Sequence, residues 1–216
     1  MLDLAGKLAV VVGAGPVGMR KVRSLVECGA RVRLVADDIS AAASQRADVS
    51  AANVETIAGK YDSAHLRGAS LVFACTDDRA LNSRIAADAR AVGALVNAAD
   101  QVEDCDFFMP AVAQDGPITV AVGTGGNCPA LAGWLRNRIQ SAMPEKLVPF
   151  AQLLSQLRQE LKSSLPSIDA RGDAIRQLMR QDAYDAYLAG GEAAVRKMLV
   201  DMLRGRDTEF GIRVSE

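Results

Sequence analysis

The stretch NAADQVEDCDFFMPA, residues 97–111, places four acidic residues after an apolar run and before two phenylalanines and a methionine. The four acids are Asp100, Glu103, Asp104 and Asp106. Three interpretations are open: charges on a solvated loop, ligands of a metal cluster, or a catalytic acid. Because no lysine or arginine occurs between Arg90 and Arg136, a positive partner must come from elsewhere in the chain, a second subunit or a ligand.

A dedicated metal cluster is not expected at these acids. His65 is the only histidine in the chain, so Cys105 is the one soft ligand near the carboxylates. Cys128 stands at the start of an expected helix, where a thiol can be activated. No histidine base is near it in the sequence, so a thiol nucleophile is not expected either.

The segment VVGAGPVG, residues 11–18, has the GxGxxG spacing directly after an apolar run and before an amphipathic one. In dinucleotide-binding folds the first glycine permits a tight turn, the second lets a pyrophosphate approach, and the third lets the helix pack on the sheet. The N-terminus of that helix faces the phosphates. A purely structural turn is the alternative. We expect NAD to be bound by Gly13, Gly15, Pro16, Val17 and Gly18.

An acidic pair follows the second expected strand, about 20 positions past the glycine loop. Asp37 stands where a carboxylate can accept hydrogen bonds from the ribose hydroxyls of an adenosine. Asp37 and Asp38 would repel a 2′-phosphate, which favours NAD over NADP as the cofactor. Arg33 lies in the same apolar run and weakens this preference slightly.

The segment ACTDD, residues 74–78, ends the fourth expected strand, at the edge where open parallel sheets bind ligands. Thr76 and Asp77 are candidate cofactor contacts. They could equally cap the helix that follows, because threonine and aspartate are both favoured at helix N-caps.

A second glycine pair precedes another expected helix in VGTGGNCPALAGWL, residues 122–135. Exposed backbone N–H groups in such a place bind carboxylates or phosphates. An N-cap formed by Thr124 or Asn127 explains the composition equally well. The candidate anion site comprises Thr124, Gly125, Gly126 and Asn127.

Short apolar runs alternate with amphipathic runs over the first hundred residues, and these elements must position the candidate loops. Strands are expected at 8–12, 31–36, 53–58, 71–75 and 94–99, with helices at 17–28 and 80–91. Strand–helix alternation predicts a parallel sheet covered by helices. The expected fold class is therefore α/β, with a Rossmann-type sheet.

The pattern changes after Asp106. Two strands are expected at 107–113 and 117–123, with a tight turn at Asp115–Gly116. The rest of the chain is expected to be helical: one helix from about 129 to Pro144, and two or three more from Leu147 on, separated at 163–167 and 190–191.

Composition narrows the possible classes. The net charge of -1 disfavours a nucleic-acid binder. No apolar run reaches the ~18 residues that a membrane span needs, and the first residues lack a cationic segment and a cleavage site, so no membrane contact or signal peptide is expected. The four cysteines form no CxxC pair, which favours a reducing cytoplasm over a disulfide or zinc framework.

Taken together, five segments resemble the precorrin-2 dehydrogenase / sirohydrochlorin ferrochelatase family of siroheme and cobalamin biosynthesis. They are, in order, GKLAVVVGAGPVGMRKV, ACTDD, NAAD, DFFMPA and AVGTGGNCPALA. GxGxxG alone occurs in many unrelated proteins, whereas the ordered set is far more specific. Many members read Ser-Ser-Gly-Gly-Thr-Ser-Pro where this chain has Gly-Thr-Gly-Gly-Asn-Cys-Pro at 123–129, so Thr124 keeps a hydroxyl and Cys128 replaces a serine.

The resemblance implies a three-part homodimer: an NAD-binding Rossmann domain at 1–113, a dimerisation segment at 114–146 and a helical C-terminal domain at 147–216. It also implies that Asp100 occupies the position of the family's catalytic aspartate. The other three acids of the stretch are then expected to be solvated loop charges. Some members carry a uroporphyrinogen methyltransferase domain as well; this chain ends at residue 216, so we expect that activity to be absent.

The implied reaction is the NAD-dependent oxidation of precorrin-2 to sirohydrochlorin, in which a hydride goes to the nicotinamide and a proton leaves the tetrapyrrole. Asp100 would take or relay that proton, or hold the pyrrole N–H groups. The polycarboxylate substrate suits the amides at 124–127. It also suits the cations Arg20, Lys21, Arg136 and Arg138.

Two questions stay open at this point. Some family members also insert iron into the product, and the sequence does not decide whether this chain does. A non-catalytic NAD-sensing regulatory module is the alternative function. It fits the glycine loop and Asp37 equally well, but it leaves the NAAD, FFMPA and GTGGN segments unexplained.

Overall fold

The computed structural model describes residues 2–39, 53–165 and 167–210. The chain divides into two compact units, one comprising 1–109 with 125–127 and the other comprising 110–124 with 128–216. The expected α/β class with a Rossmann-type parallel sheet is confirmed for the first unit, and the helical C-terminal segment for the second. The three-part division at residues 113 and 146 stays a prediction.

Five parallel strands form the sheet of the first unit, in the order β3-β2-β1-β4-β5. They are β1 Leu8–Val12, β2 Arg31–Ala36, β3 Val54–Ala58, β4 Leu71–Ala74 and β5 Leu95–Ala98. The chain adds β2 and β3 on one side of β1, then β4 and β5 on the other. Open α/β sheets bind ligands at the carboxyl ends of the strands where this reversal occurs. The candidate loops after β1, β4 and β5 all follow carboxyl ends.

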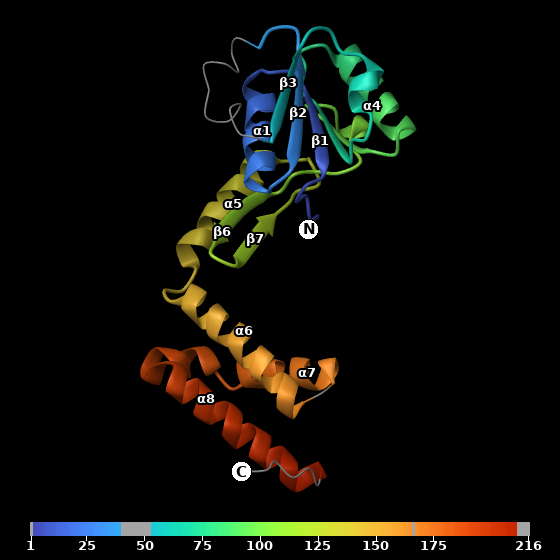
Figure 1. Cartoon of the computed structure of the whole chain (residues 1–216). Helices are drawn as coiled ribbons and strands as arrows, with labels where there is room; N and C mark the ends of the chain where they lie inside the picture. Colours follow the sequence, from blue (N-terminus) through green and yellow to red (C-terminus); the bar gives the residue numbers. More distant parts are fainter. Residues whose placement is uncertain (1, 40–52, 166, 211–216) are drawn as a thin grey trace. The chain divides into compact units, whose positions relative to one another are not determined.

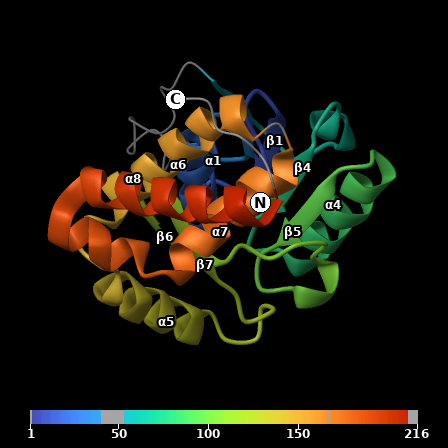
Figure 2. The ribbon, with the colours of Figure 1, turned by 90° about the horizontal axis from the view of Figure 1, so that it is seen from below.

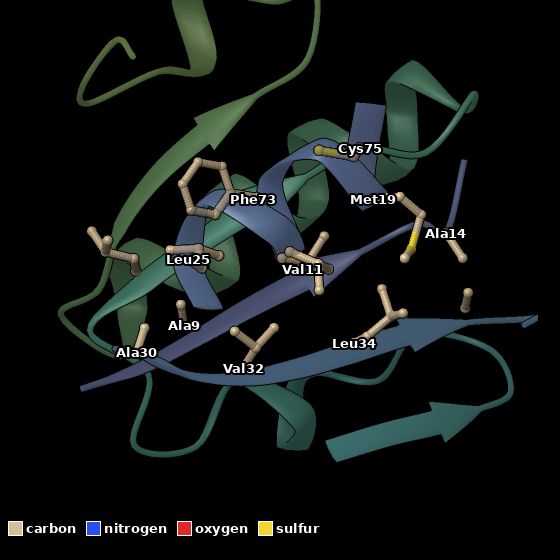
Figure 3. Close-up of a cluster of buried hydrophobic side chains, with 13 residues drawn as sticks. Ala9, Val11, Ala14, Met19, Leu25, Ala30, Val32, Leu34, Phe73 and Cys75 are labelled. Atoms are coloured by element: carbon tan, nitrogen blue, oxygen red, sulfur yellow. The ribbon is translucent and has the colours of Figure 1, made fainter. Parts of the chain in front are cut away.

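Helices α1 (Pro16–Glu27) and α4 (Arg79–Ala91) cover opposite faces of this sheet (Figure 1). Successive side chains of β1 point to the two faces, so every residue of β1 is buried. On the α1 face, Val11 of β1 packs with Met19 and Leu25 of α1 (Figure 3). On the α4 face, Val10 packs with Ile85.

A two-stranded antiparallel hairpin, β6 (Ala111–Asp115) and β7 (Ile118–Val122), opens the second unit and packs on α5 (Pro129–Ala142). The turn lies at Gly116 and Pro117 rather than at Asp115–Gly116, because Asp115 pairs with Ile118. Gly116 has φ +53, a conformation that favours glycine.

The first hairpin strand begins later than the expected residue 107. The reason lies with Phe107, whose carbonyl accepts a hydrogen bond from Asn97 Nδ2 at 2.9 Å. The Phe107 ring also packs edge-on against Phe73, with ring centroids 5.5 Å apart. Phe107 is therefore part of the first unit, and the chain is free to form a new strand only beyond Pro110.

Helices α6 (Leu147–Ser164), α7 (Ile168–Arg180) and α8 (Ala183–Phe210) share one hydrophobic core and lie side by side in both views (Figures 1 and 2). The expected separation at 163–167 is present, although Pro166 lies outside the described residues. Gly191, with φ 65 and ψ -156, interrupts α8 at the expected glycine pair. The break at Asp182, with φ 56, was not expected. None of the described helices is long and apolar enough to cross a membrane.

Candidate functional site

Two of the three glycines in the loop after β1 are required by the fold itself. Gly13 has φ +106, and a Cβ there would lie 2.4 Å from the carbonyl oxygen of Cys75, directly after β4. A Cβ on Gly18 would lie 2.0 Å from the carbonyl oxygen of Gly13. A side chain at position 13 would push the loop away from β4, and a side chain at position 18 would push α1 away from the loop.

Gly15 differs from both of these glycines. Its backbone is extended, with φ -70 and ψ 177, which any residue adopts, and an added Cβ would meet nothing within 4 Å. Gly15 is also the N-cap of α1, where no side chain accepts from the backbone N–H groups of the first turn. The fold itself therefore does not need a glycine here, and the role of Gly15 in binding the cofactor stays a prediction. Uncapped N–H groups beside open space fit the pyrophosphate of a dinucleotide.

The acidic pair Asp37 and Asp38 is exposed directly after β2. Arg33 of the same strand, the residue that weakened the preference for NAD, is engaged with other groups. Its Nε donates to Glu55 Oε2 at 2.8 Å, and its second guanidinium nitrogen donates to the His65 carbonyl at 2.7 Å. These two bonds hold Arg33 away from the role of a 2′-phosphate ligand.

The loop after β4 is fixed by Asn82, which is only 2% exposed. Asn82 Oδ1 accepts from the Thr76 hydroxyl at 2.7 Å, and its Nδ2 donates to the Thr76 carbonyl at 2.9 Å. Asp78 caps α4 by accepting from two backbone N–H groups of the first turn. The capping alternative is therefore wrong for Thr76 and Asp77, and their contact with the cofactor stays a prediction.

Asp100 stands two residues beyond β5, exposed, with φ +57. Its carboxylate has no hydrogen-bond or ion-pair partner among the residues that the structure describes. Burial raises the pKa of the Cys75 thiol to about 11; Lys21 and Arg20 oppose that shift, and the Asp100 carboxylate adds to it. Contacts at the end of β4 agree with this, since Gly13 lies against the Cys75 carbonyl and the N–H of Ala99, directly before Asp100, donates to the Ala74 carbonyl at 2.8 Å.

The four candidate cations differ in their surroundings. Burial lowers the pKa of Lys21, whose Nζ lies 5.5 Å from the centroid of the Phe73 ring and 3.2 Å from the Met109 sulfur. Arg20 and Lys21 lower the pKa of the Cys75 thiol, which the Asp100 carboxylate raises, so all three charges act on the residue at the end of β4. In the second unit, Arg136 donates to the Val112 carbonyl at 3.1 Å, and Arg138 lies over the Trp134 ring.

The expectation that the other three acids are solvated loop charges holds for Glu103 alone, which forms a 3.5 Å pair with Arg79 and is 69% exposed. Asp106 accepts from Arg90 Nε at 2.9 Å and from the backbone N–H of Val96 at 3.0 Å. Asp104 Oδ2 accepts from the Ser83 hydroxyl and from Gln101 Nε2. The expectation was wrong for these two because both have protein partners. Asp106 lies beside the edge strand β5, whose free N–H groups need acceptors, and Asp104 faces the hydroxyl of Ser83 on α4 and the amide of Gln101.

The second glycine pair adopts left-handed backbone angles, with φ +61 at Gly125 and φ +82 at Gly126. A Cβ on Gly126 would lie 2.8 Å from the Phe108 ring, so this position admits glycine alone. The N-cap of α5 is Cys128, whose own side chain makes no capping hydrogen bond, so neither Thr124 nor Asn127 is the N-cap residue. Thr124 Oγ1 instead accepts from the Cys128 N–H at 3.1 Å. An anion site at 124–127 stays a prediction.

Sequence reasoning missed three residues that build this edge. Cys75 forms the wall behind Gly13, and no sequence pattern marks it. Asn82 stands four residues after the N-cap Asp78, a position from which a helix side chain reaches back over the preceding loop. Gln101 directly follows Asp100, and its burial at 4% exposure is the signal that the sequence alone does not give.

A parallel sheet with this strand order, a glycine loop after β1 and acids after β2 and β5 define a dinucleotide-binding Rossmann domain. The chain belongs to the NAD(P)-binding family NAD_binding_7, whose model, described as "Putative NAD(P)-binding", matches residues 1–111.

Siroheme synthases are among the similar proteins. The one from Chromobacterium violaceum is 36% identical over 196 residues, which cover 90% of this chain and 41% of the relative. The one from Pseudomonas aeruginosa (strain UCBPP-PA14) is 34% identical over 203 residues, covering 94% of this chain and 43% of the relative. The chain thus spans about two fifths of the length of these relatives.

A solved structure described as "SirC, precorrin-2 dehydrogenase" has the same fold. Its TM-score is 0.69 at 22% sequence identity, and the match covers 92% of this chain and 96% of that one. The comparisons confirm the resemblance that the ordered motifs indicate.

The glycine loop yields a test that separates fold from function. We expect Gly18→Ala to lower the free energy of unfolding by about 1–3 kcal/mol, because its Cβ overlaps the Gly13 carbonyl. Gly15→Val should change stability by no more than about 0.5 kcal/mol, since its side chain enters open space. Gly15→Val should nevertheless abolish NAD binding measured by calorimetry. Wild-type affinity in Gly15→Val would contradict the assignment of this cradle to the pyrophosphate.

Proposed function

We propose that the chain is an NAD-dependent dehydrogenase that oxidises precorrin-2 to sirohydrochlorin. The observation that carries the proposal is Asp100, an exposed carboxylate without a hydrogen-bond or ion-pair partner among the described residues, near the end of β4 and the glycine loop. The similarity to siroheme synthases over nine tenths of the chain supplies the substrate class. The fold shared with a precorrin-2 dehydrogenase supports the same reaction.

The chemistry divides between cofactor and protein. NAD, when bound, supplies the acceptor for the hydride, and the overall oxidation also releases one proton from the tetrapyrrole. Gly15 and the start of α1 bind the pyrophosphate, and Asp37 binds the adenosine ribose. Asp100, free of internal partners, takes or relays the proton, or holds the pyrrole N–H groups in place.

The substrate is a polycarboxylate, so positive charge and free amides should hold it. Arg20 and Lys21 supply charge near Asp100. The backbone amides at 124–127 form a second candidate anchor, because they precede the start of α5, where the side chain of the N-cap residue Cys128 makes no capping hydrogen bond. Partial burial of Lys21 strengthens its attraction for a substrate carboxylate, since water screens it less.

A non-catalytic NAD-sensing module is not favoured. Such a module needs the glycine loop and Asp37. It does not explain why the Asp100 carboxylate has no hydrogen-bond or ion-pair partner among the described residues. It also leaves the similarity to siroheme synthases beyond residue 111 without explanation, since that similarity extends over 90% of the chain.

Cofactor choice provides one test. Asp37 and Asp38 are exposed after β2, and Arg33 is engaged elsewhere, so NAD should bind at least about tenfold more tightly than NADP, or ~1.4 kcal/mol. Asp37→Ser should weaken NAD binding and reduce the difference in affinity between NAD and NADP, as measured by titration with both cofactors. Equal or faster turnover with NADP would rule out Asp37 as the ribose ligand.

Asp100→Asn tests the catalytic role. Asparagine tolerates the left-handed backbone at this position, so the fold and the NAD affinity should survive. Loss of the proton acceptor should lower turnover of precorrin-2 by about 10²–10⁴-fold. Glu103→Gln, an exposed acid of the same loop, is the matched control and should leave turnover unchanged. A fully active Asp100→Asn enzyme would make Asp100 a structural residue.

We propose further that the chain is a homodimer joined through β6, β7 and α5. An isolated two-stranded hairpin is marginal in water. This segment also exposes large apolar side chains, which are Val112 at 42%, Leu131 at 45%, Trp134 at 57% and Ile139 at 38%. A second copy covering them would stabilise the hairpin.

Light scattering at micromolar concentration should report a dimer, and Trp134→Glu should shift it toward monomer by placing a charge in the apolar surface. Met179→Glu is the matched control, because Met179 is also an exposed apolar residue, at 43%, but belongs to α7. A monomeric wild-type protein, or a dimer that Met179→Glu disrupts and Trp134→Glu does not, would contradict the proposed interface.

We also propose that the protein works in the cytoplasm. All four cysteines are free thiols, and Cys28 and Cys128 are exposed. Exposed free thiols are kept reduced in the cytoplasm, which supports this location.

A further inference from the structure

Asp100 lies at the tip of a chain reversal on the edge of the sheet. Strand β5 ends at Ala98, and the chain then turns and runs back beside it. The returning segment is tied to the strand by several bonds. The Asp106 N–H donates to the Val96 carbonyl at 2.8 Å, the Val96 N–H donates to Asp106 Oδ2 at 3.0 Å, and the Ala98 N–H donates to Cys105 Sγ at 3.3 Å. The position of Asp100 therefore depends on how this reversal is held.

Gln101, the residue after Asp100, ties the tip of the reversal to helix α4. Its side chain is only 4% exposed. The amide Nε2 donates to Ser83 Oγ at 2.9 Å and to Asp104 Oδ2 at 3.0 Å, and it lies 3.3 Å from the carbonyl oxygen of Arg79. The Ser83 hydroxyl closes the network by donating to Asp104 Oδ2 at 2.6 Å. Ser83 and Arg79 both belong to α4, so the network fixes the turn against a rigid helix.

This arrangement carries two local costs. The Oε1 atom of Gln101 is buried and has no hydrogen-bond partner among the described residues, which is unfavourable for a polar atom. Asp100 adopts a left-handed backbone, which glycine would adopt without strain. Strain of this kind persists where the surrounding structure imposes it, and it concentrates at functional sites. Both costs fall on the two residues that present the carboxylate.

We propose that Gln101 is a positioning residue for Asp100, with Ser83 and Asp104 as its anchors. The proposal rests on the proposed function, in which the Asp100 carboxylate serves the dehydrogenation. Gln101 makes no contact with the substrate in this account; it acts by holding the turn so that the carboxylate stays near the end of β4. Loss of its donor groups releases the turn while the glycine loop and the cofactor site remain.

The test compares Gln101→Met, which keeps the side-chain volume and removes the donors, with Glu103→Gln on the same loop. Gln101→Met should lower kcat by about 10–100-fold, because small misplacement of a catalytic group has an effect of that size. The dissociation constant for NAD should stay within about twofold of the wild-type value, since the cofactor loop is untouched. NAD binding also reports that the variant is folded.

Three further variants separate a positioning role from a purely stabilising one. Gln101→Met combined with Asp100→Asn should be no slower than Asp100→Asn alone, because Gln101 acts through Asp100. Asp104→Asn keeps an acceptor oxygen for Gln101 and should retain most of the activity, whereas Asp104→Leu should resemble Gln101→Met. A wild-type kcat in Gln101→Met would overturn the proposal. So would a double variant whose loss of kcat equals the product of the losses in the two single variants.

Hydrogen exchange of the full-length protein tests whether Gln101 holds the turn, and it needs no substrate. Gln101→Met should accelerate exchange in the peptide spanning 99–105, whereas Glu103→Gln and Asp100→Asn should leave it at the wild-type rate. If the wild-type protein does not oxidise precorrin-2, the proposed function is refuted. The hydrogen-exchange comparison still tests the role of Gln101 in that case. An exchange rate in Gln101→Met equal to that of the wild type would refute the proposal that Gln101 holds the turn, whatever the activity.

Discussion

The structure depends on the close approach of three backbone segments at the carboxyl end of β1. Gly13 lies against the Cys75 carbonyl after β4, and Gly18 in α1 lies against the Gly13 carbonyl. Both contacts leave no room for a Cβ, so they set the distance between the glycine loop, the helix and the neighbouring strand. The same approach leaves the start of α1 uncapped and the space at Gly15 open. A structural constraint is thereby accompanied by an uncapped helix start beside open space, which is the place that we propose for the pyrophosphate.

The acids after β5 have separate tasks, which answers the question that their clustering raises. Asp106 accepts from the edge strand and from Arg90, and Asp104 accepts from Ser83 and Gln101, so both hold the chain reversal. Glu103 is an exposed charge in a surface pair, which contributes little to stability. Asp100 alone has a carboxylate that the described protein atoms do not bind. Asp104 and Asp106 hold the loop that carries Asp100, and this arrangement is consistent with a reaction that needs a proton acceptor.

The fold was largely predictable because its signals are local. Continuous apolar runs ending in glycine or acid predict buried parallel strands, and all five strands lie within one residue of their expected bounds at either end. The glycine loop was predictable for the same reason. The late start of β6 was not, because it results from a contact between Phe107 and Phe73, 34 positions away in the sequence. The hydrogen-bond network of Gln101 was not predictable either, because its partner Ser83 lies on α4, 18 positions away in the sequence, and no residue spacing marks it.

We propose that the glycine loop and Asp100 serve one site. A crystal structure of the protein with NAD bound tests this claim most directly. We predict that the pyrophosphate lies against Gly15 and the first turn of α1, with the adenosine ribose at Asp37. The nicotinamide should lie toward the ends of β4 and β5, with the Asp100 carboxylate beside an open space large enough for a tetrapyrrole edge. A cofactor bound with its nicotinamide directed away from β5, or with Asp100 on the opposite side of the sheet edge, would contradict the account.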